Sequence, residues 1–117
     1  LTVYGDGSNW RPFVHVEDAA RAYRSAALAP EDWSQHVYNV GRNDQNFRIE
    51  EIAEIVRDEL DRSLDITYLE EEHPGPSYHV NFDRLAETGF EPEWTLPDGV
   101  RDVAAQLEGS ESGEVVV

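Results

Sequence analysis

A glycine bend followed closely by an arginine stands near the start of the chain and constrains the fold around it. Residues 5–7 read Gly-Asp-Gly, and glycine adopts positive φ without the steric penalty that other residues meet. We therefore predict a tight turn between a strand at residues 1–4 and a second short strand at residues 12–16. Arg11 lies between them, so two ordered elements fix its position. A guanidinium presents a planar fork of donors, which suits a phosphate group.

Two amphipathic helices follow from the spacing of apolar residues. After Val16 the apolar positions 16, 19, 20, 23, 26 and 27 form one face at helical spacing, with Pro30 as the stop. We expect this face to pack on a core. A second helix is expected over residues 49–60, where apolar residues recur every three or four positions and acidic side chains cover the other face.

Two further helices are expected from their end signals. A short helix is predicted from Asn81, as N-cap, to Gly89 just after its last turn. Three of its apolar residues are expected to face inward: Phe82, Leu85 and Ala86. Thr95, with Asp98 three residues later, is typical of a capping-box start and opens a last helix.

Short strands are expected between these helices. Residues 36–41 are predicted to form a buried strand that ends on a glycine, and residues 65–69 another short strand. Residues 42–46 have the composition of a loop, and two prolines around a glycine predict a shaped loop at residues 70–77. Strand and helix alternate, which predicts an α/β fold with about four helices, or an α+β fold if this chain is taken alone.

The surface charge limits the partners of the protein. The chain carries 25 Asp and Glu residues against nine Lys and Arg, a formal net charge of −16, and all nine basic residues are arginines. Such a charge repels nucleic acid and anionic membranes and argues against both as partners. Self-repulsion also destabilises the fold, and salt screens it. We therefore interpret the composition as adaptation to a high-salt cytoplasm, as in halophiles.

The residues that are missing narrow the chemistry further. The chain contains no cysteine, so it has no disulfide, thiol nucleophile or thiolate metal site. No apolar run reaches the length of a membrane span or of a signal-peptide core, which favours a cytoplasmic protein. Methionine is absent and the first residues have strand character, so we expect the chain to be cut from a longer one.

The opening stretch resembles a known family signature. The resemblance rests on Tyr-Gly-Asp-Gly at residues 4–7, Arg11, Phe-Val-His-Val at residues 13–16, and Asp18. This pattern resembles the start of the carboxy-terminal part of NAD-dependent sugar-nucleotide epimerases and dehydratases, the extended short-chain dehydrogenase/reductases. Later pieces at residues 37–41, 49–56 and 89–99 resemble the following strand and helices of that family.

The resemblance implies a division of labour between two halves. In this family the amino-terminal half is a Rossmann domain that binds NAD and carries a Tyr-x-x-x-Lys pair, and the carboxy-terminal half holds the sugar nucleotide. With no lysine, this chain has no such pair and no catalytic residue of its own. We therefore expect a substrate-binding domain at residues 1–107, a polar tail at residues 108–117, an NDP-sugar as ligand, and no cofactor bound by this chain alone. NAD and the Rossmann half belong to the parent enzyme.

Four residues are candidates for ligand contacts under this resemblance. Arg11 is assigned to the diphosphate, and Tyr78 is the second candidate by its position in the family pattern. His73 stands where the family usually carries the arginine of Arg-Pro-Gly-Asp, so it gives a weaker clamp or is replaced by His79. Asn39 ends a predicted strand, where an α/β sheet often places its ligand, so the nucleotide base is expected there.

Simpler interpretations of these residues remain open. Arg11 on residue type alone is a surface ion-pair partner, and Tyr78 is a half-buried tyrosine with a solvated hydroxyl. The run Glu-Glu-Glu-His at residues 70–73 is more typical of a solvated acidic loop than of a metal site. His15 is interpreted as structural and Asp18 as an anion at a helix start. The alternative function is a stand-alone acidic interaction module that keeps the fold without catalysis.

Overall fold

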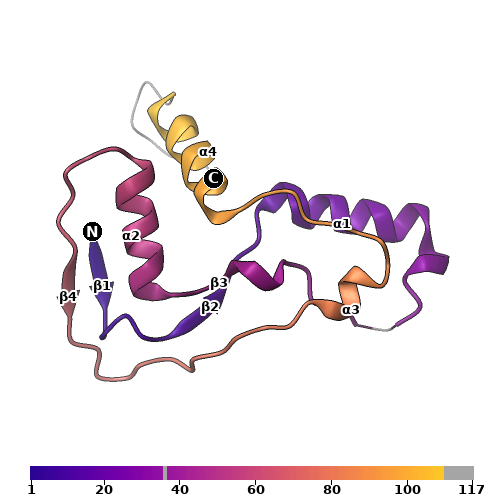
Figure 1. Cartoon of the computed structure of the whole chain (residues 1–117), viewed down its shortest axis with the longest axis horizontal. Helices are drawn as coiled ribbons and strands as arrows, with labels where there is room; N and C mark the ends of the chain where they lie inside the picture. Colours follow the sequence, from indigo (N-terminus) through magenta and orange to yellow (C-terminus); the bar gives the residue numbers. More distant parts are fainter. Residues whose placement is uncertain (36, 110–117) are drawn as a thin grey trace.

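The computed structural model describes residues 1–35 and 37–109, an elongated body of 48 × 37 × 23 Å (Figure 1). Its elements are, in chain order, β1 (Thr2–Tyr4), β2 (Trp10–Pro12), α1 (Val16–Leu28), η1 (Pro30–Asp32), η2 (Asn43–Gln45), β3 (Asn46–Arg48), α2 (Ile49–Glu59), β4 (Thr67–Leu69), α3 (Asp83–Ala86) and α4 (Leu96–Glu108), where η marks a 3₁₀ turn. The predicted mixture of short strands and about four helices is confirmed.

The strands form two separate pairs that the glycine bend connects. β1 pairs with β4 in parallel, and β2 pairs antiparallel with β3, with Arg11 opposite Phe47. Gly5 and Gly7 have φ of +84° and +77°, as the bend was predicted to require. The backbone N–H of Gly5 donates to the carbonyl of Leu69 at 2.7 Å, which continues the β1 and β4 pairing into the bend.

The start of α4 confirms its end signal in the sequence, whereas the cap predicted at Asn81 differs. Thr95 caps α4 and forms the predicted capping box with Asp98. α2 begins directly after β3, so this helix and the strand pair are joined without a loop. α1 starts after His15, whose Nδ1 accepts from the backbone N–H of Glu17 at 3.0 Å. His15 therefore has a structural role at the start of α1, in agreement with the interpretation from the sequence.

The core is small and lies between α1 and α3. Ala22 of α1 packs with Leu85 of α3 and with Phe90, and Trp33 and Val40 lie against this cluster. Figure 1 shows α1 and α3 at one end of the body and the β1 and β4 pair at the other. The two ends are connected by the β2 and β3 pair, so no single layer covers the whole molecule.

The prediction of a strand at residues 36–41 is wrong over the described part of this segment. Residues 37–41 belong to no strand, Val37 is 67% exposed, and residue 36 lies outside the described residues. A strand is defined by hydrogen bonds to a neighbouring strand. None of the four strands in the described part of the chain lies next to this segment, so its apolar pattern has no partner here.

The prediction that the apolar face of α1 packs on a core is also wrong for most of that face. Val16 is 74% exposed and Tyr23 82% exposed. The buried side of the helix carries Asp18 and Ala22 instead. Apolar side chains on a helix face that meets solvent lose the stabilisation that burial provides, so the described residues leave this face uncovered.

Smaller differences concern element boundaries. α3 is shorter than predicted, its N-cap is Phe82, and Ala86 is exposed instead of inward. Asn81 lies one residue before the N-cap, and its side chain still accepts from the backbone N–H of Asp83 at 2.7 Å. The second strand covers Trp10–Pro12 instead of residues 12–16, because pairing with β3 ends there. The expected loop at residues 42–46 contains η2 and the first residue of β3.

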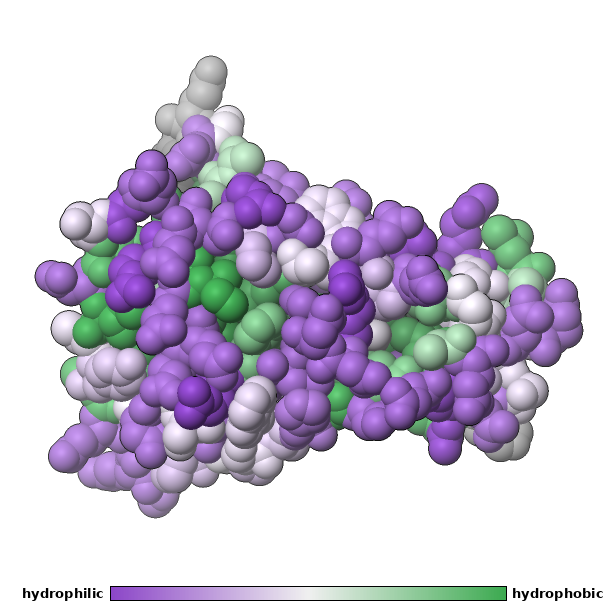
Figure 2. Space-filling model, in the orientation of Figure 1, coloured by the Kyte–Doolittle hydropathy of each residue, from purple (hydrophilic) through white to green (hydrophobic). Residues whose placement is uncertain are grey.

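The outer surface is mainly polar. Figure 2 shows a predominantly hydrophilic face on which hydrophobic residues gather in separate patches. One apolar groove runs between the β2 to α1 connection, α2 and α4, and it includes Phe13, Val100 and Leu107. Within residues 1–35 and 37–109, the structure contains no helix with the length and apolar character needed to cross a bilayer.

Candidate functional site

Arg11 is the central residue of β2, and the pairing with β3 fixes its backbone. Its Cα lies opposite Phe47, and its side chain is half-buried. The Nη1 group donates to the carbonyl of Trp10 at 2.7 Å. One nitrogen of the guanidinium is therefore engaged within the strand.

The loop that follows β4 is attached to β2 by three hydrogen bonds, although about 66 residues separate them along the chain. The Nδ2 of Asn9 donates to the carbonyl of Gly75 at 3.1 Å. The backbone N–H of Trp10 donates to Oγ of Ser77 at 2.9 Å, and the backbone N–H of Tyr78 donates to the carbonyl of Trp10 at 3.3 Å. In Figure 1 this loop runs along the strand pair toward α3.

The attached loop brings two of its residues against the Arg11 guanidinium. The Cζ of Arg11 lies 4.8 Å from the centre of the Tyr78 ring, within the range of a cation–π contact. A Cβ at Gly75 would lie 3.2 Å from Nη2 of Arg11, so a side chain at this position would crowd the guanidinium. Arg11 and Tyr78, predicted separately from the sequence, therefore lie in contact.

A cavity of about 890 Å³ opens beside Arg11. Its walls come from β1, the glycine bend, β4 and the loop that contains Pro74 and Gly75, and Ile49 at the start of α2 closes one side. Arg11 is among the residues that line this cavity, and its guanidinium lies close to Gly75 of the Pro-Gly-Pro segment. The site therefore has both a concavity and a fixed cation.

Four carboxylates also line this cavity. Asp6 and the three glutamates at residues 70–72 line it together with Arg11. The side chain and backbone N–H of Ser8 donate to Asp6, which lowers the pKa of this carboxyl group. Within the described residues, no group of three or more His, Asp or Glu side chains is arranged to hold a metal ion.

The other two candidate residues, His73 and Asn39, do not line the cavity beside Arg11. His73 is exposed between Glu72 and Pro74, and it is not among the side chains that line the cavity. Asn39 lies in a separate hollow beside α3, with Arg84 and Asn81 in its wall. The ring of His79 makes an edge contact with Trp10, with 5.3 Å between ring centres.

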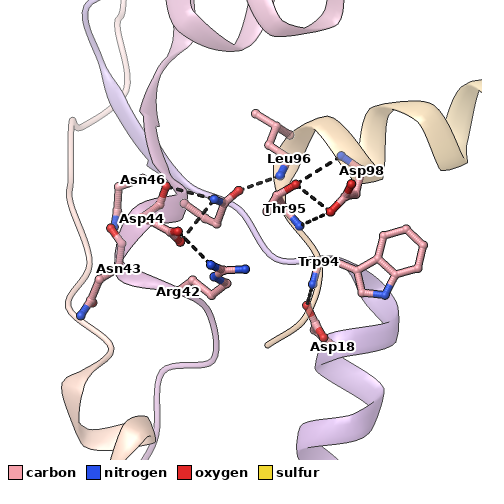
Figure 3. Close-up of polar contacts among 10 residues, drawn as sticks. Asp18, Arg42, Asn43, Asp44, Asn46, Trp94, Thr95, Leu96 and Asp98 are labelled. Atoms are coloured by element: carbon pink, nitrogen blue, oxygen red, sulfur yellow. Dashed lines mark hydrogen bonds and ion pairs between the residues drawn. The ribbon is translucent and has the colours of Figure 1, made fainter. Parts of the chain in front are cut away.

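Asp18 has a role that the sequence did not indicate. Its carboxylate is fully buried and accepts from the backbone N–H groups of Glu93 and Trp94, each at 2.9 Å. Nη1 of Arg21 donates to it at 2.9 Å as well. Figure 3 shows the contact between Asp18 and Trp94 beside the capping box of α4. Asp18 therefore joins α1 to the segment that leads into α4, in addition to lying in the first helical turn.

His15 and Gln45 join further segments to α4. Nε2 of His15 lies 3.0 Å from Oδ2 of Asp102, and its ring stacks on Trp94 with 3.7 Å between ring centres. The pKa of the Asp102 carboxyl group is lowered, chiefly by the hydrogen bond with His15. The backbone N–H of Leu96 donates to Oε1 of Gln45 at 2.6 Å. These residues position α4 and lie outside the cavity.

Comparison with known proteins gives the family. The family model described as the NAD dependent epimerase/dehydratase family matches residues 1–41. The low-salt glycan biosynthesis protein Agl12 of Haloferax volcanii is 32% identical over 102 residues, which cover 86% of this chain and 32% of that protein. Residues 1–41 thus match the NAD-dependent epimerase/dehydratase family, and the chain is similar to a curated relative over 86% of its length.

Solved structures of the epimerase/dehydratase family have the same fold over most of the chain. The dTDP-glucose 4,6-dehydratase of Bacillus anthracis, in complex with NAD, matches 96% of this chain with a TM-score of 0.69 and 26% identity. The UDP-N-acetylglucosamine 4-epimerase of Methanobrevibacter ruminantium, in complex with UDP-N-acetylmuramic acid, matches 90% with a TM-score of 0.68 and 25% identity. The matches cover 35% and 34% of those two chains.

The chain thus spans about a third of the length of the epimerase/dehydratase relatives it matches. The contacts that hold the loop to β2 were not expected from the sequence, because Asn9 and Ser77 carry no family motif. A signal was nevertheless present, since Gly75 stands in a loop with a proline on each side. Such a glycine indicates a close approach by another group, and that group is Arg11.

Proposed function

We propose that this chain is the sugar-nucleotide-binding part of an NAD-dependent epimerase or dehydratase, and that Arg11 contacts the diphosphate of an NDP-sugar. The observation that carries the proposal is the position of Arg11 at a cavity, between β2 and the Pro-Gly-Pro loop. A guanidinium held by its own strand is ordered before the ligand arrives, so less side-chain entropy is lost on binding. Contacts to the non-reacting diphosphate orient the sugar for chemistry elsewhere.

Tyr78 is proposed to support the arginine and to border the ligand. Its ring lies against the guanidinium at 4.8 Å and leaves about half of its surface exposed. An aromatic face holds a guanidinium in one plane, which favours a fork of donors over a mobile charge. His73 is proposed to contact the ligand only after the exposed loop adjusts, and Asn39 to contact a more distant part of it.

The partner of this chain is proposed to be an amino-terminal Rossmann half that binds NAD. Three surfaces of this chain favour a missing neighbour: the exposed apolar face of α1, the strand-like residues 37–41 without a partner strand, and the apolar groove beside α4. The relatives are about three times longer than the matched chain, which agrees with this arrangement. Redox chemistry would then belong to the other half, with no catalytic residue and no cofactor bound by this chain alone.

The acidic surface is proposed to be an adaptation to a salt-rich cytoplasm. The net charge of −16 and the use of arginine for all basic residues support it. The relative in Haloferax volcanii agrees with this idea. Near 1 M salt the Debye length is roughly 3 Å, so the repulsion between charges of one sign on the surface is screened.

A second candidate function is an acidic interaction module with this fold and no ligand. The exposed His73 in place of the family's usual arginine favours it. The sequence of the gene upstream separates the two candidates. An in-frame dinucleotide-binding domain with a Tyr-x-x-x-Lys pair would rule out the stand-alone module, and a stop codon directly upstream would support it.

The binding test titrates the whole chain with UDP-glucose or dTDP-glucose and follows binding by NMR. The titration is done at about 1 M salt, which screens the repulsion between the acidic surface and the diphosphate. We expect a saturable shift of the Gly75 backbone amide signal, because Gly75 lines the cavity beside Arg11. Removing a charge-assisted hydrogen bond costs about 1.5 to 3 kcal/mol, so Arg11→Gln should weaken binding by about 10- to 100-fold. Arg57→Gln is the matched control, since Arg57 is a half-buried arginine of α2 that does not line the cavity.

Two results would contradict the proposal. The first is binding by the folded Arg11→Gln protein with the same affinity as the original chain. The second is a probe-induced shift that spares Gly75 and instead affects residues of the α3 hollow. A Tyr78→Phe variant should bind normally and Tyr78→Ala more weakly, because the contact with Arg11 uses the ring and not the hydroxyl group.

A further inference from the structure

The cavity beside Arg11 has an unusual charge for a diphosphate site. Its lining contains one basic side chain, Arg11, and four acidic ones, Asp6 and the glutamates at residues 70–72. One positive and four negative groups leave a local formal charge of −3. A diphosphate that enters this cavity therefore meets more repulsion than attraction from the charges around it.

The acidic side chains of the wall differ from Arg11 in how they are placed. The three glutamates at residues 70–72 are exposed and follow β4 directly. Asp6 accepts from Ser8, which lowers its pKa and keeps it ionised near neutral pH. Arg11 is half-buried and is held by β2, with the Tyr78 ring on one side. The carboxylates thus act through solvent, whereas the arginine is ordered at the wall.

We infer that the affinity of this site for a diphosphate rises with ionic strength, and that the acidic wall at residues 70–72 sets this direction. The inference rests on the proposed function, because it concerns the ligand that Arg11 would hold. It identifies the salt concentration as a regulator of the site. The opposite dependence is usual, since added salt weakens the binding of phosphates by basic proteins.

The direction follows from the range of each interaction. Salt reduces the Debye length from about 10 Å at 0.1 M to about 3 Å at 1 M. Charges that act across solvent are screened most, whereas a charge in direct contact with its partner is screened much less. The glutamates repel across solvent and Arg11 attracts by contact, so salt removes repulsion faster than attraction. The net interaction with a diphosphate then becomes more favourable.

The experiment measures the dissociation constant of inorganic pyrophosphate and of UDP-glucose for the full chain at about 0.1 M and about 1 M KCl. NMR titration of the Gly75 backbone amide signal gives the affinity, and the same spectra report whether the chain remains folded at each concentration. For the original chain we expect the affinity to rise at least several-fold with salt. Arg11→Gln should lose most of the binding at both concentrations.

The test variant removes the acidic wall and keeps the shape of its side chains. It carries Glu70→Gln, Glu71→Gln and Glu72→Gln. We expect it to bind more tightly than the original chain at about 0.1 M salt and to lose affinity as salt is raised. Removal of these three charges would therefore reverse the direction in which the affinity changes with salt.

The control variant has the same total charge as the test variant but keeps the cavity wall. It carries Glu31→Gln, Asp32→Asn and Glu87→Gln, all exposed and none lining the cavity. The first two lie in η1, which follows α1, and the third lies just after α3, at the opposite end of the body from β4 (Figure 1). We expect this variant to keep the rise of affinity with salt.

Each remaining outcome has a definite meaning. An affinity of the original chain that falls steadily with salt overturns the inference while the proposed function stands. Equal behaviour of the test and control variants also overturns it, because the charge of the whole chain would then set the direction. Absence of saturable binding by the folded chain at both salt concentrations, or binding independent of Arg11, overturns the proposed function itself.

Discussion

The buried carboxylate of Asp18 offers the most direct test of how this fold is held together. The substitution Asp18→Asn keeps the size of the side chain and removes one acceptor oxygen. In the structure the two oxygens serve the N–H groups of Glu93 and Trp94, both at 2.9 Å. After the substitution the amide nitrogen faces one of these donors, since an amide has a single acceptor oxygen.

The expected cost follows from these contacts. A buried donor left without an acceptor costs about 1 to 3 kcal/mol. Hydrogen bonds to an ionised group are about twice as strong as neutral ones, so the remaining bond weakens by about 1 kcal/mol more. We therefore expect Asp18→Asn to lower the free energy of unfolding by about 2 to 4 kcal/mol. This is a large part of the roughly 5 to 15 kcal/mol that stabilises a typical domain.

Urea denaturation followed by tryptophan fluorescence measures this cost, because Trp94 lies directly at the affected contact. Glu17→Gln is the matched control in the same helical turn, with an exposed side chain. If Asp18 acted only as an anion at a helix start, both substitutions would cost about 0.3 to 1 kcal/mol. Equal effects of the two changes would refute the role of Asp18 as a connection between α1 and the segment before α4.

Three further predictions concern backbone strain, acid and salt. Gly7→Ala should destabilise the chain by more than Gly89→Ala, because both residues have positive φ but only at Gly7 would the added Cβ meet another side chain, at 2.9 Å; equal urea midpoints would contradict this. The pKa of Asp98 is lowered, chiefly by its hydrogen bond with the Thr95 side chain, so its stabilising effect is present above the ordinary Asp pKa of about 3.9 and is lost as pH falls through the lowered value. Asp98→Asn should therefore flatten the decline of stability with acid, whereas the exposed control Asp32→Asn should not. Dilution from about 1 M to below about 0.1 M salt should lower the melting temperature through unscreened repulsion, and a melting curve indifferent to salt would remove the argument for a salt-adapted surface.

Local rules accounted for the parts of the fold that depend on near neighbours. The bend at residues 5–7, the start of α4 at Thr95 and the period of α2 were all predicted from residues within a few positions of one another. Glycine φ, capping and helical period are decided by such short-range contacts. The family resemblance named Arg11 and Tyr78 as separate candidates, and the structure brings the two into contact.

The failures concern features that depend on distant or missing neighbours. Asp18 was interpreted from its place in a helical turn, but its backbone partners lie 75 and 76 residues further along the chain. The strand predicted at residues 36–41 and the apolar face of α1 have sequences suited to burial. Residues 37–41 form no strand and most of the α1 face is exposed, because a strand needs a second strand and an apolar face needs a covering layer.

The way the loop is attached to β2 affects how the site can change during evolution. Gly75 and Tyr78 are held to Asn9 and Trp10 through their own main-chain atoms, so these two attachments survive many replacements of neighbouring loop side chains. Under the proposed function, mutations at Pro76 or His73 would therefore change ligand preference while the arginine keeps its place. Gly75 does not share this freedom, because any side chain there would push against the guanidinium. A library that randomises the loop and spares this glycine would be a sensible starting point for redesigning ligand preference.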